Sequence, residues 1–194
     1  RLVLVLALIT STAPALAQTP PAPAATPAPA PAVPAPAYGA PIGLAAAQAL
    51  IARAVEAAGA RGFRMAIAVV EPSGELVAFG RMDDVQYGSI AVSQRKATTA
   101  ARFRTATAAL EERVANGRTV ILAMHEMLPV AGGVPIVVDG RIVGAIGVSG
   151  ASSAQDDEIA RAALASMRVM RQCATCERQN TTCSRRGSSM SSSV

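Results

Sequence analysis

Three glycines, Gly144, Gly147 and Gly150, punctuate the apolar run GRIVGAIGVSGAS and precede a predicted helix. Glycines between a strand and a helix can cradle a phosphate when they belong to a βαβ unit and have the spacing G-x-G-x-x-G. The spacing here is G-x-x-G-x-x-G, and the single lysine of the sequence, Lys96, follows no glycine loop of the Walker type. The run is therefore a weak candidate for a nucleotide-phosphate site.

Other residue combinations give hydrolase chemistry no support. Asp83 and Asp84 are adjacent carboxylates, but sequence neighbours seldom face one another as an acid–base pair does. His125 is the only histidine, and no Ser-His-Asp set or metal-spaced cluster of His and Asp is apparent. A function that depends on binding is favoured over hydrolysis.

Four helices are expected from apolar periodicity and stop signals. They cover residues 44–59, 89–103, 105–117 and 153–170. We expect Ser89 and Ser153 to be N-caps, and Asp156 to lie where the last helix dipole favours negative charge, as do Asp157 and Glu158. The buried stripe of the first helix should consist of Leu44, Ala47, Ile51, Val55 and Ala58.

Strand patterns occur in two hairpins. Residues 65–71 and 75–82 flank a Pro-Ser-Gly turn, and residues 134–138 and 141–149 flank Asp139-Gly140, a strong hairpin signal. The segment TVILAMHEMLPV, residues 119–130, is ambiguous between a strand and a short helix that leads into a strand. The order of elements predicts an α/β fold of the α+β type, with a mainly antiparallel sheet of about five strands covered by helices.

Both faces of the strand 141–149 are apolar. Ile142, Gly144, Ile146 and Val148 alternate with Val143, Ala145, Gly147 and Ser149. Both faces should therefore be covered. Glycine inside a strand indicates close approach by another backbone or a ligand, and helix packing or a subunit contact is the favoured explanation.

Composition and charge limit the partners. The sequence is 51% hydrophobic but 3% aromatic and lacks tryptophan, which predicts an aliphatic, alanine-rich core. The net charge is +5, but acidic and basic residues nearly balance between residues 44 and 168, and most of the excess lies near the ends of the chain. A basic stripe interleaved with aromatic residues is missing from the predicted domain, so nucleic acid is not an expected partner.

The chain divides into four predicted parts. Residues 1–18 form a signal peptide with an apolar run, Leu2–Ile9, and a small-x-small site, Ala15-Leu16-Ala17. The run is shorter than the ~20 residues that a membrane span needs, so we expect an exported, periplasmic or extracellular protein without a transmembrane anchor. Residues 19–43 are a Pro/Ala-rich disordered linker, 44–170 the domain, and 171–194 a disordered Ser/Arg/Cys tail. In the tail, Glu177 follows a C-x-x-C pair where covalent haem attachment requires histidine.

Three blocks carry a resemblance to a known family: IAVVEPSGELVAFGRMDD, SIAVSQRKATTAARF and LPVAGGVPIVVDGRIVGAIGVSGASSAQDDEIA. They resemble the GlcG/HbpS family of haem-binding, haem-degrading proteins over roughly residues 44–167. The resemblance implies a profilin-like or PAS-like sandwich, a homo-oligomer, and haem or another flat small molecule as ligand. Haem breakdown or haem sensing would follow. A non-catalytic oligomeric module for interaction or small-ligand sensing, and an accessory protein of corrinoid or glycolate pathways, stay as alternatives because a fold does not fix a function.

Candidate cofactor-binding residues follow from the resemblance and from haem chemistry. Haem iron is held by His, Cys, Met or Tyr side chains, so His125 is the candidate metal ligand, with an exposed or capping histidine as the alternative. The resemblance adds Lys96, Thr98 and Thr99, whose alternative is a solvated helix face. Chemistry favours His125 because imidazole is the better iron donor, whereas the resemblance favours the helix, and on balance the helix is preferred. The loop before that helix supplies two further candidates that could rim a pocket, Met82 and Tyr87.

Overall fold

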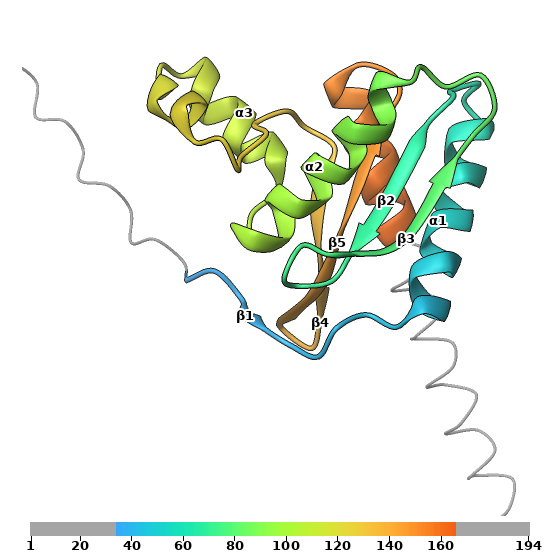
Figure 1. Ribbon diagram of the computed structural model, residues 1–194, viewed down its shortest axis with the longest axis horizontal. Coiled ribbons are helices and arrows are strands. Elements are labelled where there is room, and N and C mark those ends of the chain that lie inside the picture. Colours follow the sequence, from blue (N-terminus) through green and yellow to red (C-terminus); the bar gives the residue numbers. More distant parts are fainter. Residues whose placement is uncertain (1–33, 166–194) are drawn as a thin grey trace, which may run out of the picture. The chain divides into compact units, whose positions relative to one another are not determined.

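The computed structural model describes residues 34–165 (Figure 1). The predicted signal peptide, most of the Pro/Ala linker and the cysteine-containing tail lie outside the described residues. Within the described part, no helix is long and apolar enough to cross a membrane.

The described residues form a five-stranded sheet. The strands β5 (Arg141–Ser149), β2 (Ala66–Val70) and β3 (Leu76–Arg81) are neighbours in that order, and β4 (Gly133–Val138) pairs with the other edge of β5. All of these pairs are antiparallel. The short strand β1 (Ala37–Tyr38) runs parallel to the first residues of β5. The expected sheet of about five mainly antiparallel strands is confirmed.

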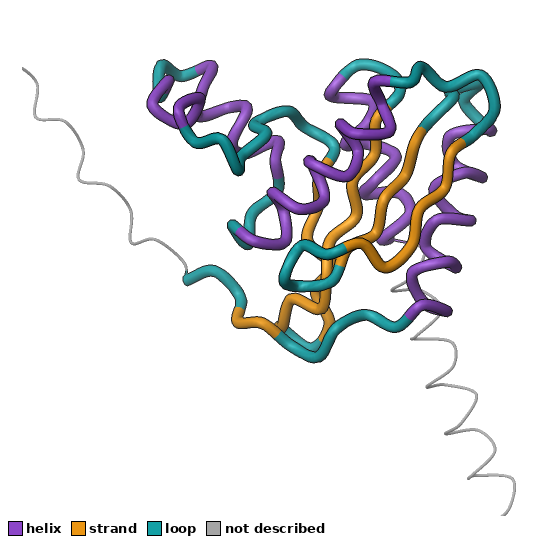
Figure 2. Tube along the Cα trace, in the orientation of Figure 1, coloured by secondary structure: helices purple, strands orange, loops and turns teal. Residues whose placement is uncertain are grey.

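Helices cover both faces of this sheet (Figures 1 and 2). On one face, α1 (Leu44–Gly59) and a helix over residues 153–165 pack against a cluster that includes Ile67, Val69, Ile146 and Val148. On the other face, α2 (Gly88–Arg102) contributes alanines to a cluster with Ala68, Val70 and Ala145. In chain order, α3 (Thr107–Ala115) and the 3-10 helix η1 (Thr119–Ala123) follow α2 and precede β4. The ambiguous segment 119–130 therefore contains a short helix followed by turns.

Gly147 shows why glycine is needed within β5. A Cβ atom at this position would overlap the Ser93 carbonyl oxygen of α2 and lie 2.6 Å from the Ala97 amide nitrogen. Because the obstructing atoms are backbone atoms, they cannot move aside as a flexible side chain could. The expected close approach at this glycine is confirmed, and helix packing is its cause.

Two local expectations are wrong, and a third is right only in part. The buried residues of α1 include Ala47 and Ala58, as expected, but the others are Leu50 and Ala54. Ile51 and Val55 are half-buried, and Leu44 is 55% exposed. Ser89 is buried inside α2, which has no side-chain cap bond. The last helix is capped by Ser152, whose Oγ accepts from the Gln155 amide at 3.4 Å while Gln155 Oε1 accepts from the Ser152 amide at 3.1 Å.

The segment before α1 is packed against the domain, although it belongs to the predicted linker 19–43. Its Tyr38 hydroxyl donates to the Arg102 carbonyl at 2.8 Å and so satisfies an acceptor at the end of α2. The Gly39 amide donates to the Ile142 carbonyl at 2.8 Å, and Ile42 is buried in the core. The ordered structure therefore begins before the predicted boundary at Leu44.

Candidate functional site

The single lysine lies in a buried ion pair. Lys96 is 1% exposed, and its Nζ donates to Asp156 Oδ2 at 2.7 Å and to the Val148 carbonyl at 3.1 Å. Asp156 Oδ1 accepts from the Ala151 amide at 3.0 Å. The pair connects α2, β5 and the last helix. A solvated helix face is therefore the wrong description of Lys96. Asp156 lies in the first turn of the last helix, as expected, but it is buried there.

Electrostatics at this pair are dominated by the loss of water. Burial raises the pKa of the Asp156 carboxyl above its usual 3.8, against the opposing effect of hydrogen bonds from Lys96 and the Ala151 amide. A buried pair gains little net stability over apolar residues of the same volume, but removal of one partner leaves the other charge unpaired. In the structure, the Lys96 amine is therefore enclosed by protein groups of β5 and the last helix.

Gly132 covers the ion pair at the start of β4. Its φ of +119° favours glycine, and a Cβ there would lie 2.9 Å from Lys96 Nζ. Its carbonyl accepts from the Val148 amide at 2.9 Å. The backbone of Gly132 therefore closes the site directly over the Lys96 ammonium, and leaves no room for a side chain.

Two side chains of α3 hold the same loop. The Gly133 amide donates to Thr107 Oγ1 at 2.8 Å, and the Ala131 amide donates to Glu111 Oε2 at 2.8 Å. The second oxygen of Glu111 accepts from Ser153 Oγ at 2.9 Å. These bonds attach the loop that enters β4 to α3 and to the start of the last helix.

His125 occupies an exposed turn nearer the start of this loop, before Ala131 and Gly133 in the chain. The turn Met124–Met127, called here the His125 turn, is closed by a hydrogen bond of 3.0 Å from the Met127 amide to the Met124 carbonyl. His125 and Glu126 are its two central residues, and both are exposed. Immediately after the turn, the Leu128 amide donates to Thr99 Oγ1 at 3.0 Å. The imidazole is thus presented to solvent by a turn that is attached to α2.

Large apolar side chains precede the imidazole in the same short segment. Val120 is 65% exposed, Leu122 is 60% exposed and Met124 is 45% exposed. We call these three residues and His125 the η1 surface. Exposed apolar residues this close together in the sequence are candidates for contact with a ligand or another protein. The η1 surface therefore combines apolar contact area with a nitrogen donor.

The other predicted residues lie elsewhere. Thr98 Oγ1 donates to the Gly74 carbonyl at 3.0 Å, in the turn between β2 and β3. Met82 is half-buried, and its sulfur accepts from the Met65 amide at 3.4 Å. Tyr87 is 82% exposed just before α2. The buried Thr99 side chain is hydrogen-bonded to the Leu128 amide, in the loop that carries His125.

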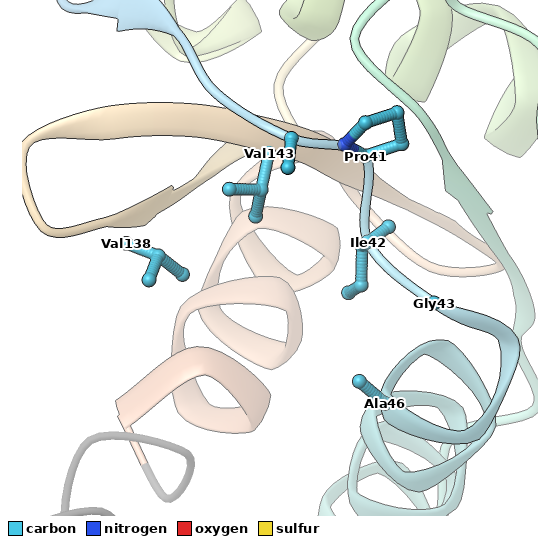
Figure 3. Close-up of a pocket in the computed structure, with 7 residues that line it drawn as sticks. Pro41, Ile42, Gly43, Ala46, Val138 and Val143 are labelled. Carbon is cyan, nitrogen blue, oxygen red and sulfur yellow. The ribbon is translucent and has the colours of Figure 1, made fainter.

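A separate hollow lies beside β1 and the hairpin of β4 and β5 (Figure 3). Its volume is about 210 Å³, below the 300–1,000 Å³ typical of small-molecule pockets. Its lining is entirely apolar: Ala40, Pro41, Ile42, Gly43, Ala46, Val138 and Val143. The hollow offers no side chain that could ligate iron, so the η1 surface is the stronger candidate site.

Comparison with known proteins places this geometry in a family. The family model described as "Haem degrading protein HbpS-like" matches residues 42–165, most of the part that the structure describes. The chain belongs to the HbpS-like family. The family expected from the three sequence blocks is confirmed.

Individual relatives agree with this assignment. This HbpS-like chain is 45% identical over 103 residues to Protein GlcG of Escherichia coli K12, which covers 53% of this chain and 77% of GlcG. A crystal structure of a doubly substituted HbpS from Streptomyces reticuli has a TM-score of 0.61 and 34% identity, and the match covers 74% of this chain and 97% of that one. The structure of a PduOC–haem complex has a TM-score of 0.58 and 28% identity, and the match covers 64% and 94% of the two chains.

The donor set of the η1 surface fits haem. Imidazole and thioether are both side-chain groups that ligate haem iron, and His125 and Met124 supply them beside aliphatic side chains. Within residues 34–165, no cluster of three His, Cys, Asp or Glu residues could hold a free metal ion.

Sequence reasoning misses two features that shape this region. The position of Asp156 in the first helical turn is predicted, but its ion pair with Lys96 is not, although Lys96 is singled out as the one lysine among many arginines. Glu111 carried no signal, because its partners are backbone and hydroxyl groups distant in the sequence.

Proposed function

We propose that this protein is an exported haem-binding protein that holds haem at the η1 surface, with His125 as the iron ligand. The observation that carries the proposal is the exposed imidazole at a turn that adjoins Val120, Leu122 and Met124. The family description and the PduOC–haem complex support haem as the ligand class. Bound haem supplies a redox-active iron.

The burial of the alternative donors supports His125 over α2. Lys96 Nζ already donates to a carboxylate and a carbonyl, and Thr99 Oγ1 already accepts from the Leu128 amide. Ligation by Lys96 would also break its buried ion pair with Asp156. His125 is exposed. The preference for α2 that the sequence resemblance favoured is therefore reversed in this proposal.

Hemin titration of the full chain tests the proposal. We expect a saturable Soret band with one haem per chain. His125→Ala should shift the band and weaken binding by about tenfold or more, because the apolar residues retain contact but the iron loses its donor. Glu126→Ala, in the same turn, is the matched control and should bind hemin like the unchanged chain.

Two results would contradict this assignment. A Soret band unchanged in His125→Ala would place the iron ligand elsewhere. A featureless rise in absorbance on hemin addition would remove the haem site and favour the alternative of a non-catalytic interaction module, which sedimentation would then test as a homo-oligomer.

The proposal also includes export of the protein and breakdown of bound haem. Ala15-Leu16-Ala17 supports cleavage before Gln18, and N-terminal sequencing of the secreted chain should begin there. Retention of the run Leu2–Ile9 in a membrane fraction would contradict export. For breakdown, we expect the Soret band of the complex to decay under ascorbate and oxygen faster than that of free hemin, with release of iron.

A further inference from the structure

The loop that carries His125 is attached to its surroundings by side chains on two helices. Glu111 and Thr107 of α3 bind its later part, at the amides of Ala131 and Gly133. Thr99 of α2 binds its earlier part, at the Leu128 amide. Leu128 follows the His125 turn directly, so of these three contacts the one with Thr99 is nearest to His125 in the sequence.

Thr99 is well suited to hold this turn. Its side chain is fully buried, and it belongs to the helix that packs most closely on β5 through Ala97 and Gly147. The 3.0 Å bond to the Leu128 amide therefore connects the residue after an exposed turn to a helix that packs on the sheet. The turn itself contributes one closing bond, between Met127 and Met124.

We propose that Thr99 is a positioning residue for His125: its hydroxyl fixes the residue after the turn, so that the imidazole is held beside the η1 surface. This inference rests on the proposed haem function. It assigns α2 an effect on the site that acts through the loop, without contact between Thr99 and the haem. A valine has nearly the shape of threonine but leaves the Leu128 amide without its acceptor.

Neighbouring threonines give a matched pair of variants. Thr99→Val in the full chain should weaken hemin binding by about threefold to tenfold and broaden or shift the Soret band, because the imidazole samples more orientations. Thr98→Val removes a hydroxyl bonded to the Gly74 carbonyl instead, and should stay within about twofold of the unchanged chain. Thr99→Ser retains the hydroxyl and should restore the spectrum.

A double-mutant cycle separates positioning from general damage. If Thr99 acts through His125, Thr99→Val should have no further effect on hemin affinity in the His125→Ala chain. An equal loss in both backgrounds would overturn the proposal, as would an unchanged affinity and spectrum in Thr99→Val.

Hydrogen exchange keeps the inference testable without haem. The Leu128 amide should be protected in the unchanged chain and in Thr98→Val, and should exchange faster in Thr99→Val. If hemin does not bind at all, the proposed function fails while this measurement still reports on the Thr99 contact. Equal protection in all three chains would overturn the inference. Should Thr99→Val not fold, Thr99→Ala replaces it in each experiment.

Discussion

At the interface between α2 and β5, the backbones of the two elements pack directly against each other. The segment from η1 to the His125 turn instead exposes large side chains to solvent. At the interface, Gly147 admits the Ser93 carbonyl and the Ala97 amide, and Lys96 is buried with its carboxylate partner. In the other region, Val120 and Leu122 are more exposed than buried.

The first region is close-packed, and the second is open to a ligand. Small residues let α2 lie directly on the sheet, and a larger side chain there would overlap neighbouring atoms. The exposed side chains of Val120 and Leu122 contribute little to the core and are accessible to a ligand. Hydrogen bonds such as Thr99–Leu128 then connect the exposed turn to the rigid helix.

Removal of the buried cation should have the largest effect. Lys96→Met leaves the Asp156 carboxylate buried without its partner, and should lower the free energy of unfolding by about 3–5 kcal/mol in urea titrations at pH 7. The double variant Lys96→Met/Asp156→Leu removes both charges and should recover most of this loss.

An ion pair with an exposed cation gives the control for this experiment. Arg161 Nε lies 2.6 Å from Asp157 Oδ2, the Arg161 side chain is 55% exposed, and Arg161→Met should cost less than about 1 kcal/mol. Similar losses from Lys96→Met and Arg161→Met would mean that burial does not distinguish the two pairs.

A larger residue at Gly147 should have the next effect. Gly147→Val places atoms against the backbone of α2 and should lower the free energy of unfolding by about 3 kcal/mol, read from the thermal midpoint. Gly88→Ala, at the first residue of α2, meets open space and serves as control. At Gly140 a Cβ atom would contact nothing, so Gly140→Ala has only the cost of the positive φ, and it should leave hemin binding unchanged. An unchanged midpoint in Gly147→Val would show that this face of β5 is open.

The smallest effect on stability is expected at the η1 surface. Leu122→Ser should change the free energy of unfolding by less than about 0.5 kcal/mol, because the side chain is already exposed. It should nevertheless weaken hemin binding by about fivefold through lost apolar contact. Leu44→Ser, an equally exposed position on α1, should leave affinity unchanged. If Leu122→Ser destabilises the fold as Gly147→Val does, the two regions are not built differently.

Local signals predicted several elements well. Asp139 and Gly140 both have positive φ, as the turn of the expected hairpin requires, and α1 spans the predicted residues 44–59. The two apolar faces of β5 correctly predicted cover on both sides. The expected caps Ser89 and Ser153 are wrong: Ser89 is buried in α2, and Ser153 Oγ donates to Glu111 while its neighbour Ser152 caps the last helix.

The sequence by itself determined the family, the order of most elements and the two-sided burial of β5, because these depend on residue types and on periodicity along the chain. Only the tertiary structure decided that Lys96 is buried, since its partner Asp156 is 60 residues away and no local pattern joins them. It also decided that the segment 119–130 forms a short helix and turns, and that Thr99 reaches Leu128 while Thr98 does not. Contacts between distant segments set the environment of a side chain, and that environment separates a structural lysine from an exposed histidine.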